Sequence, residues 1–69
     1  MVEVFKTNIN KIKPSKALIR KLLSHYPGSS FHIDINDCDR VLRVEGEDFC
    51  PVQIIKLVTS DGYECEVLN

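Results

Sequence analysis

The residues best suited to chemistry are three cysteines, two histidines and a cluster of acidic side chains in the middle of the chain. Cys38, Cys50 and Cys65 are too far apart in the sequence to form a Cys-x-x-Cys motif. An odd number of cysteines cannot all pair within one chain, so reduced thiols are the expected state.

Two of the cysteines have neighbours that suggest ordinary roles. Cys38 lies in the polar turn 36–39, where a single metal contact is conceivable but a plain turn residue is the simpler interpretation. Cys65 alternates with Glu64 and Glu66, so its side chain is expected to face the core as a small apolar group.

Cys50 is the candidate redox-sensitive thiol. It precedes Pro51 at the predicted start of a helix, where the positive end of the helix dipole favours a thiolate. The acidic neighbours Glu47 and Asp48 oppose this effect. A plain N-cap residue without special reactivity is therefore the favoured interpretation.

No constellation of catalytic residues is visible. His25 and His32 have no histidine or cysteine partner at metal-ligand spacing, and the adjacent Ser24 and His25 point in different directions on a helix. The acidic stretch 34–39 lacks the glycine and the closing glutamate of an EF-hand loop. We therefore predict no catalytic residue, no enzyme activity and no cofactor.

Length and composition predict one small globular domain, residues 1–69. The chain has 69 residues, of which 43% are hydrophobic and 28% are charged. No apolar run approaches the roughly 20 residues that span a bilayer, and the N-terminus lacks the features of a signal peptide. A cytoplasmic protein without membrane insertion is expected.

The charges are segregated along the chain although they nearly cancel. The formal net charge of −1 argues against nucleic-acid binding, which requires neutralising several phosphates. One stretch without an acid nevertheless contains Lys6, Lys11, Lys13, Lys16, Arg20 and Lys21. Such a stretch is usually a solvated helix face, but it could also steer an acidic protein partner. The docking hypothesis names Lys11, Lys13, Lys16 and Arg20 as partner-binding residues of a monomer or weak dimer.

Hydrophobic periodicity predicts a β-α-β-β-α-β order. Helical spacing connects Leu18, Ile19, Leu22, Leu23 and Tyr26, while period-two alternation is clear around Ile33, Val44 and Cys65. The predicted elements are a strand at 2–5, a helix at 14–26, strands at 31–36 and 40–45, a helix at 51–60 and a strand at 63–67. This order is typical of an α+β, ferredoxin-like sandwich with two helices on one face of a four-stranded antiparallel sheet.

The uncovered face of that sheet is expected to be mostly acidic. Its predicted residues are Glu3, Phe5, His32, Asp34, Val41, Arg43, Glu45, Glu64 and Glu66. Within the basic stretch of the sequence, Ile9 and Ile12 are expected to form a small apolar centre.

The segments 33–46, 54–56 and 62–67, in the second half of the chain, resemble parts of the heavy-metal-associated domains of copper chaperones and metal-pumping ATPases. The segment 33–46 resembles the central hairpin of that family, and 54–56 with 62–67 resembles its second helix and last strand. Leu22-Leu23 and Pro27-Gly28 resemble the end of its first helix. The resemblance covers nearly the whole chain and implies the same fold.

The metal-binding loop of the family is the part that this chain lacks. The family carries Met-x-Cys-x-x-Cys between its first strand and first helix, but those cysteine slots fall near Ile12 and Ser15 here, and Asn10 stands in the methionine slot. A linear copper(I) site needs two soft sulfur donors held close together. We therefore expect no metal at this loop.

Three hypotheses of function remain open. The first is a non-enzymatic interaction or regulatory module that recognises a partner through its surface. The second is soft-metal handling or transport, in which Cys38 or a partner's thiols complete a site. The third is a thiol redox sensor at Cys50.

Overall fold

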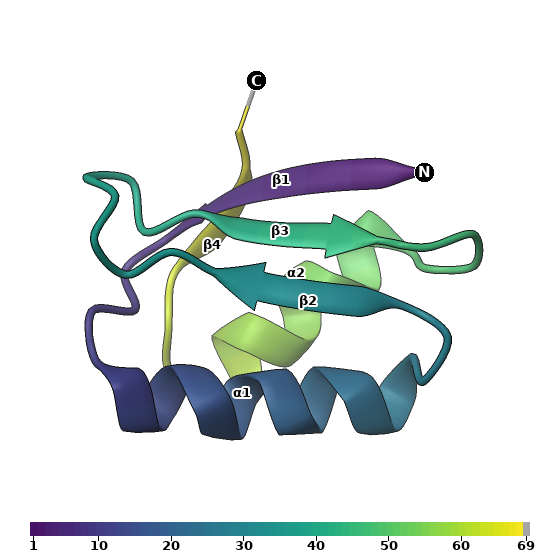
Figure 1. Cartoon of the computed structure of the whole chain (residues 1–69), viewed down its shortest axis with the longest axis horizontal. Helices are drawn as coiled ribbons and strands as arrows, with labels where there is room; N and C mark the ends of the chain where they lie inside the picture. Colours follow the sequence, from purple (N-terminus) through teal and green to yellow (C-terminus); the bar gives the residue numbers. More distant parts are fainter. Residues whose placement is uncertain (69) are drawn as a thin grey trace.

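The computed structural model describes residues 1–68 and confirms the predicted order of elements. The elements are β1 (Val2–Thr7), α1 (Ile12–His25), β2 (Ser30–Ile33), β3 (Leu42–Glu45), α2 (Pro51–Ser60) and β4 (Cys65–Val67). The strands form one antiparallel sheet in the order β2-β3-β1-β4 (Figure 1). The fold is therefore an α+β sandwich of the ferredoxin-like type.

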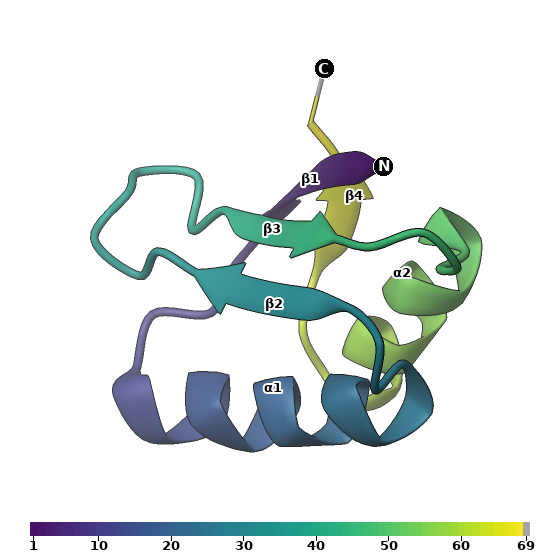
Figure 2. The same ribbon diagram turned by 45° about the vertical axis from the view of Figure 1, so that its right-hand side comes forward.

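The two helices lie side by side on one face of the sheet, as Figures 1 and 2 show from two directions. α1 packs beneath the edge strand β2, and α2 packs beneath the opposite edge strand β4. Neither helix of the described chain is long and apolar enough to cross a membrane.

The core is built on the register of β1 against β3. Phe5 lies opposite Leu42, and both side chains are fully buried beneath the sheet. The expectation that Phe5 lies on the open face is wrong, because β1 turns Val2 and Val4 outward instead. Burying one phenyl ring removes more apolar surface from water than burying a valine, which favours this register.

α1 begins two residues earlier than predicted. Its first residue is Ile12, and Pro14 sits within the first turn, where the missing amide proton breaks no helical hydrogen bond. Ser15, Leu18 and Leu22 form the buried stripe of the helix. The predicted apolar face is therefore confirmed at Leu18 and Leu22.

Lys21 connects the two helices. Its ammonium group donates hydrogen bonds to the Leu57 carbonyl at 3.2 Å and the Ser60 hydroxyl at 2.8 Å, and it contacts Asp61 Oδ1 at 2.6 Å. α2 has no basic residue in its own last turn. Lys21 therefore supplies from α1 the positive charge that stabilises the C-terminal end of α2.

A polar loop, residues 34–41, joins β2 to β3. β2 ends earlier than predicted, because Asp34 Oδ1 accepts the Asn36 amide at 3.0 Å and Asp37 Oδ1 accepts the Asp39 amide at 2.8 Å. These side-chain bonds favour turns over a continued strand. Arg40, at φ 47°, completes the reversal of the chain.

The second half of the chain follows the prediction more closely. Cys50 is the N-cap residue of α2 and Pro51 is the first helical residue. Gly62, at φ 90°, turns the chain after the helix, and β4 is limited to Cys65–Val67. Ile54, Leu57 and Val58 form the buried face of α2.

Substitutions at two adjacent leucines test the packing of α1. Leu22 is fully buried, so Leu22→Ala should lower the free energy of unfolding by about 2–4 kcal/mol. Leu23 is 38% exposed, and Leu23→Ala should have a clearly smaller effect. Chemical denaturation measures both changes, and equal losses would show that the helix is rotated.

Lys21→Met should destabilise the domain by about 1 kcal/mol, because it removes the charge at the end of α2 but keeps the aliphatic chain. Lys16→Met is the matched control, since Lys16 is exposed on the same helix and has no ion pair within residues 1–68. Thermal unfolding of both variants gives the comparison. A loss as large for Lys16→Met would refute the specific role of Lys21.

Candidate functional site

The loop between β1 and α1, residues 8–11, stands where the resembling family holds its metal. Ile9 is buried almost completely, and its amide donates a hydrogen bond to Thr7 Oγ1 at 3.3 Å. Ile9 therefore anchors the loop to the core, and the expectation that it forms an exposed apolar centre is wrong. Ile12 does lie at the surface, with 59% of its area exposed.

The two cysteine slots of the resembling family are occupied by unlike side chains. Ile12 is exposed, whereas Ser15 is buried and donates from Oγ to the Ile12 carbonyl at 2.7 Å. An alkyl group and a hydroxyl group already engaged with the backbone offer no pair of soft donors. The residues present therefore do not fit a copper(I) site of the family's type.

Thr7 fastens the 34–41 loop to this end of the sheet, a role that the sequence analysis missed. Its hydroxyl donates to the Arg40 carbonyl, and its amide donates to the Asp39 carbonyl at 3.1 Å. Thr7 follows Phe5 at a spacing of two, and this alternation is the signal that could have placed it inward.

Cys38 lies at the same end of the molecule as the 8–11 loop, as its place in the hairpin predicts. Together with Asn8, Asn10, Thr7 and Arg40 it lines a shallow cavity of about 290 Å³. The Cys38 side chain is exposed, and one potential ligand atom each of Asp37, Cys38 and Asp39 lies within 4.8 Å of the others. Consecutive residues in a turn reach such distances without a metal.

The carboxylates around Cys38 are already engaged. Asp37 accepts the Asp39 amide, and Asp39 lies 3.9 Å from the Lys6 ammonium group. Cys38 thus contributes a single soft donor between two hard oxygen donors, which is a poor set for copper(I).

The other two cysteines lie far from this loop or inside the fold. Cys50 is exposed at the N-terminus of α2, and its side chain makes no capping hydrogen bond. Cys65 faces the helices and packs against the core, which confirms its predicted role. Burial raises the pKa of the Cys65 thiol to about 11, and the charge of Glu66 adds to this effect.

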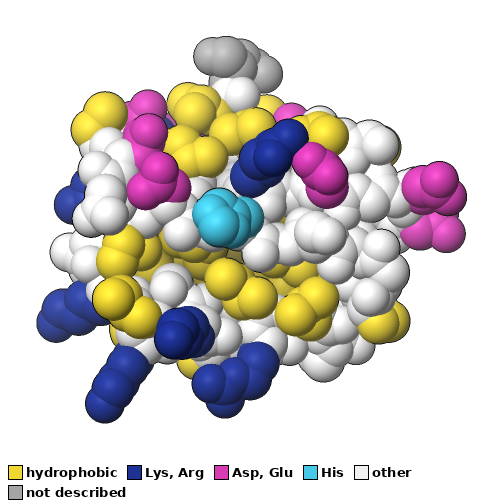
Figure 3. Space-filling model, in the orientation of Figure 1, with side chains coloured by type: hydrophobic (Ala, Val, Ile, Leu, Met, Phe, Trp, Pro, Cys, Tyr) yellow, Lys and Arg dark blue, Asp and Glu magenta, His cyan; other side chains and the backbone are white. Residues whose placement is uncertain are grey.

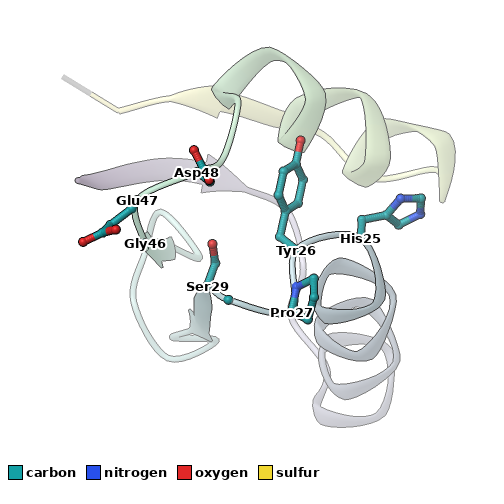
Figure 4. A pocket seen from close by; sticks show the side chains of 8 residues that line it. His25, Tyr26, Pro27, Ser29, Gly46, Glu47 and Asp48 are labelled. Atoms are coloured by element: carbon teal, nitrogen blue, oxygen red, sulfur yellow. The ribbon is translucent and has the colours of Figure 1, made fainter.

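A cavity of about 540 Å³ lies at the other end of the molecule, between the end of α1 and the loop 46–48. Figure 4 shows that the Tyr26 ring points toward α2, whereas His25 and Glu47 point away from each other. Asp48 lies on the same loop as Glu47 (Figure 4). Because the titratable groups do not converge, the cavity has no acid–base pair suited to catalysis.

The predicted basic residues do lie together on the outer surface of α1 and the turn before it. Lys11, Lys13, Lys16 and Arg20 are all exposed. Figure 3 shows the Lys and Arg side chains along α1, below a band of hydrophobic side chains. We call Lys11, Lys13, Lys16 and Arg20 the basic surface.

The open face of the sheet is less acidic than predicted. Val2 and Val4 take the place expected for Glu3 and Phe5, and Lys6 faces Glu66 across the β1–β4 pair. On β3, Arg43 forms an ion pair with Glu45 at 2.8 Å. Acids and bases are therefore mixed on this face, whereas the basic surface of α1 contains no acid.

Neither a protein-family model nor a characterised protein matches this sequence. Membership of the heavy-metal-associated family therefore remains a prediction from the residues described above.

The metal-loop interpretation predicts that copper(I) and zinc leave the amide chemical shifts of residues 7–15 unchanged. The reason is that this segment contains no thiolate or imidazole donor. Titration of the reduced protein, followed by NMR, checks this outcome. Shift changes confined to residues 7–15 would contradict it, whereas changes centred on Cys38 that disappear in Cys38→Ser would favour the soft-metal hypothesis.

The three thiols should react at different rates. Because the thiolate is the reactive form, Cys65 should resist iodoacetamide near pH 8 and react only as the pH approaches about 11. The exposed Cys38 and Cys50 should be modified first. Peptide mapping of the alkylated protein gives the order, and early labelling of Cys65 in the folded protein would refute its burial.

Proposed function

We propose that this domain is a non-enzymatic protein-interaction module that binds an acidic partner through the basic surface of α1. The observation that carries the proposal is that some basic residues form ion pairs within residues 1–68 of the domain and those of the basic surface do not. Lys6, Lys21 and Arg43 each form an ion pair within the domain. No ion pair within residues 1–68 involves the four residues of the basic surface.

Unpaired positive charge on one face has a physical consequence. The like charges repel one another, so they do not stabilise the fold, but together they attract a negatively charged protein and accelerate its association. Ile12 adds an exposed apolar side chain between Lys11 and Lys13. A cationic rim around a small apolar area is the composition of a transient protein contact.

The resemblance to heavy-metal-associated domains supports the same surface. In that resemblance, the end formed by the loop and the start of the first helix corresponds to the chaperones' contact surface. On this proposal, the domain uses the same contact region but has Ile12 and Ser15 in the place of the sulfur ligands.

The two alternative functions have less support. Soft-metal handling would require a second sulfur donor from outside the chain, because Cys38 lies among oxygen donors. A redox sensor at Cys50 would require an activating group, whereas the neighbouring Glu47 and Asp48 are acidic.

Charge reversal on the basic surface tests the proposal. Immobilised wild-type protein and Lys13→Glu/Lys16→Glu are compared for the proteins that they retain from the native host. Partners should be lost by the double variant and by added salt, because both remove electrostatic attraction. The melting temperature should stay nearly unchanged, since exposed charges contribute little to stability.

The matched control is a pair of single variants, Lys16→Glu and Lys56→Glu. Both lysines are exposed on helices, and the two substitutions change the net charge equally. Only Lys16→Glu should weaken capture. Partners that are retained equally by all variants at low salt would overturn the proposal.

A further inference from the structure

β2 is an edge strand whose outer backbone groups have no partner strand among residues 1–68. Its residues pair with β3 alone, and the register places Phe31 opposite Val44 and Ile33 opposite Leu42. The Asp34 amide donates to the Val41 carbonyl, so the even-numbered residues of β2 direct their backbone groups toward β3. Phe31 and Ile33 therefore direct their amide and carbonyl groups to the free edge.

The side chains of the same two residues face the helix layer. Val44 and Leu42, their cross-strand neighbours, are fully buried on that side of the sheet. Phe31 and Ile33 pack against the core but are only partly buried, because β2 is the last strand on this side of the described sheet. The exposed parts of the Phe31 and Ile33 side chains lie on the side of the sheet that faces α1.

One flank of α1 extends this apolar surface. Lys21 reaches α2, so its flank of the helix points away from the free edge. At 3.6 residues per turn, Ile12, Ile19 and Leu23 lie on the opposite flank, which is the side of β2. Ile12 and Leu23 are 59% and 38% exposed, and Ile19 is partly buried.

The result is an apolar surface strip between the free edge of β2 and the positively charged residues of α1. Figure 3 shows the band of hydrophobic side chains between β2 and α1, with Lys and Arg side chains along the α1 border. Lys16 and Arg20 follow Ile12 and Ile19 around the helix and are exposed at this border.

We infer that the partner presents an extended segment that adds to β2 as a fifth strand, with apolar side chains at alternate positions and acidic residues at its ends. This inference rests on the proposed function and specifies the form of the partner. The backbone of the segment pairs with Phe31 and Ile33, its apolar side chains cover the stripe of Ile19 and Leu23, and its acids meet Lys16 and Arg20.

Charge complementarity favours an acidic partner segment at the β2 edge over a second copy of the chain. Pairing two β2 edges would bring the two α1 helices side by side and place like charges on Lys16 and Arg20 together. The other sheet edge, β4, is shorter, contains Glu66 and is preceded by Glu64. An acidic segment would be repelled there.

The strand geometry makes the inference testable with one synthetic peptide. The probe has isoleucines alternating with threonines in its centre and aspartates at both ends. If it pairs as inferred, residues opposite Phe31 and Ile33 share their side-chain direction, so the isoleucines face the helix layer and the isoleucine amides point to β2.

Two methylated forms of the probe separate backbone pairing from side-chain contact. One carries N-methyl groups on the isoleucine amides and the other on the threonine amides, so the two share composition and charge. Binding to the full domain is measured by fluorescence anisotropy. Methylation of the isoleucine amides should weaken binding at least about tenfold, because the hydrogen bonds to the β2 edge are lost.

The second form, methylated on the threonine amides, should bind nearly as well as the parent peptide, and the NMR shifts on binding should be largest at the Phe31 and Ile33 amides. Equal binding of the two methylated forms, weakened by Lys16→Glu, would overturn strand addition while leaving the basic surface as the docking site. No binding of the parent peptide, or shifts centred on β4 or the open sheet face, would overturn the inference. Capture of host proteins by the basic surface tests the proposed function separately.

Discussion

Both helices must share one face of a four-stranded sheet, and this constraint determines which surfaces the domain offers to other molecules. α2 lies under β4 and α1 under β2, so each helix has a neighbour on only one flank. Lys21 fixes the facing flanks by binding the end of α2. The remaining flank of α1 faces solvent beside the free edge of β2, with its apolar residues nearest the strand and its charges farther out.

The end of the fold that corresponds, in the resemblance, to the family's metal site is held rigidly by local contacts in this chain. Ile9 fills the core beneath the loop, Ser15 bonds back to the Ile12 carbonyl, and Thr7 holds the 34–41 loop. These contacts satisfy the backbone and the side chains locally. The resemblance thus concerns the scaffold, and the positive surface lies next to this end of the fold.

Much of the fold followed from the sequence, because periodicity reports burial directly. The alternation around Val44 and Cys65 and the helical spacing of Leu18 and Leu22 gave the correct elements and faces. Phe5 was misplaced because Val2, Val4 and Phe5 form an apolar run without alternation, and only pairing with Leu42 decides its direction. Ile9 was misplaced because burial of a loop residue depends on tertiary contacts.

The candidate site was predicted only in part, for a similar reason. The sequence identified the lysines and the arginine of the basic surface, since unlike charges are missing from that stretch. It did not predict that Lys21 pairs with Asp61 at the end of α2, and it did not separate the exposed Leu23 from the buried Leu22. Both distinctions depend on how α1 is rotated between its neighbours.

Amide hydrogen exchange in the free domain tests most directly whether the β2 edge is open. His32 and Asp34 direct their amides toward β3 and should exchange slowly, whereas the Phe31 and Ile33 amides, which alternate with them, point to the free edge and should exchange orders of magnitude faster. The alternation along one short strand provides its own control. Equally slow exchange at all four amides would show that the edge is already occupied and would contradict its role in docking a partner strand.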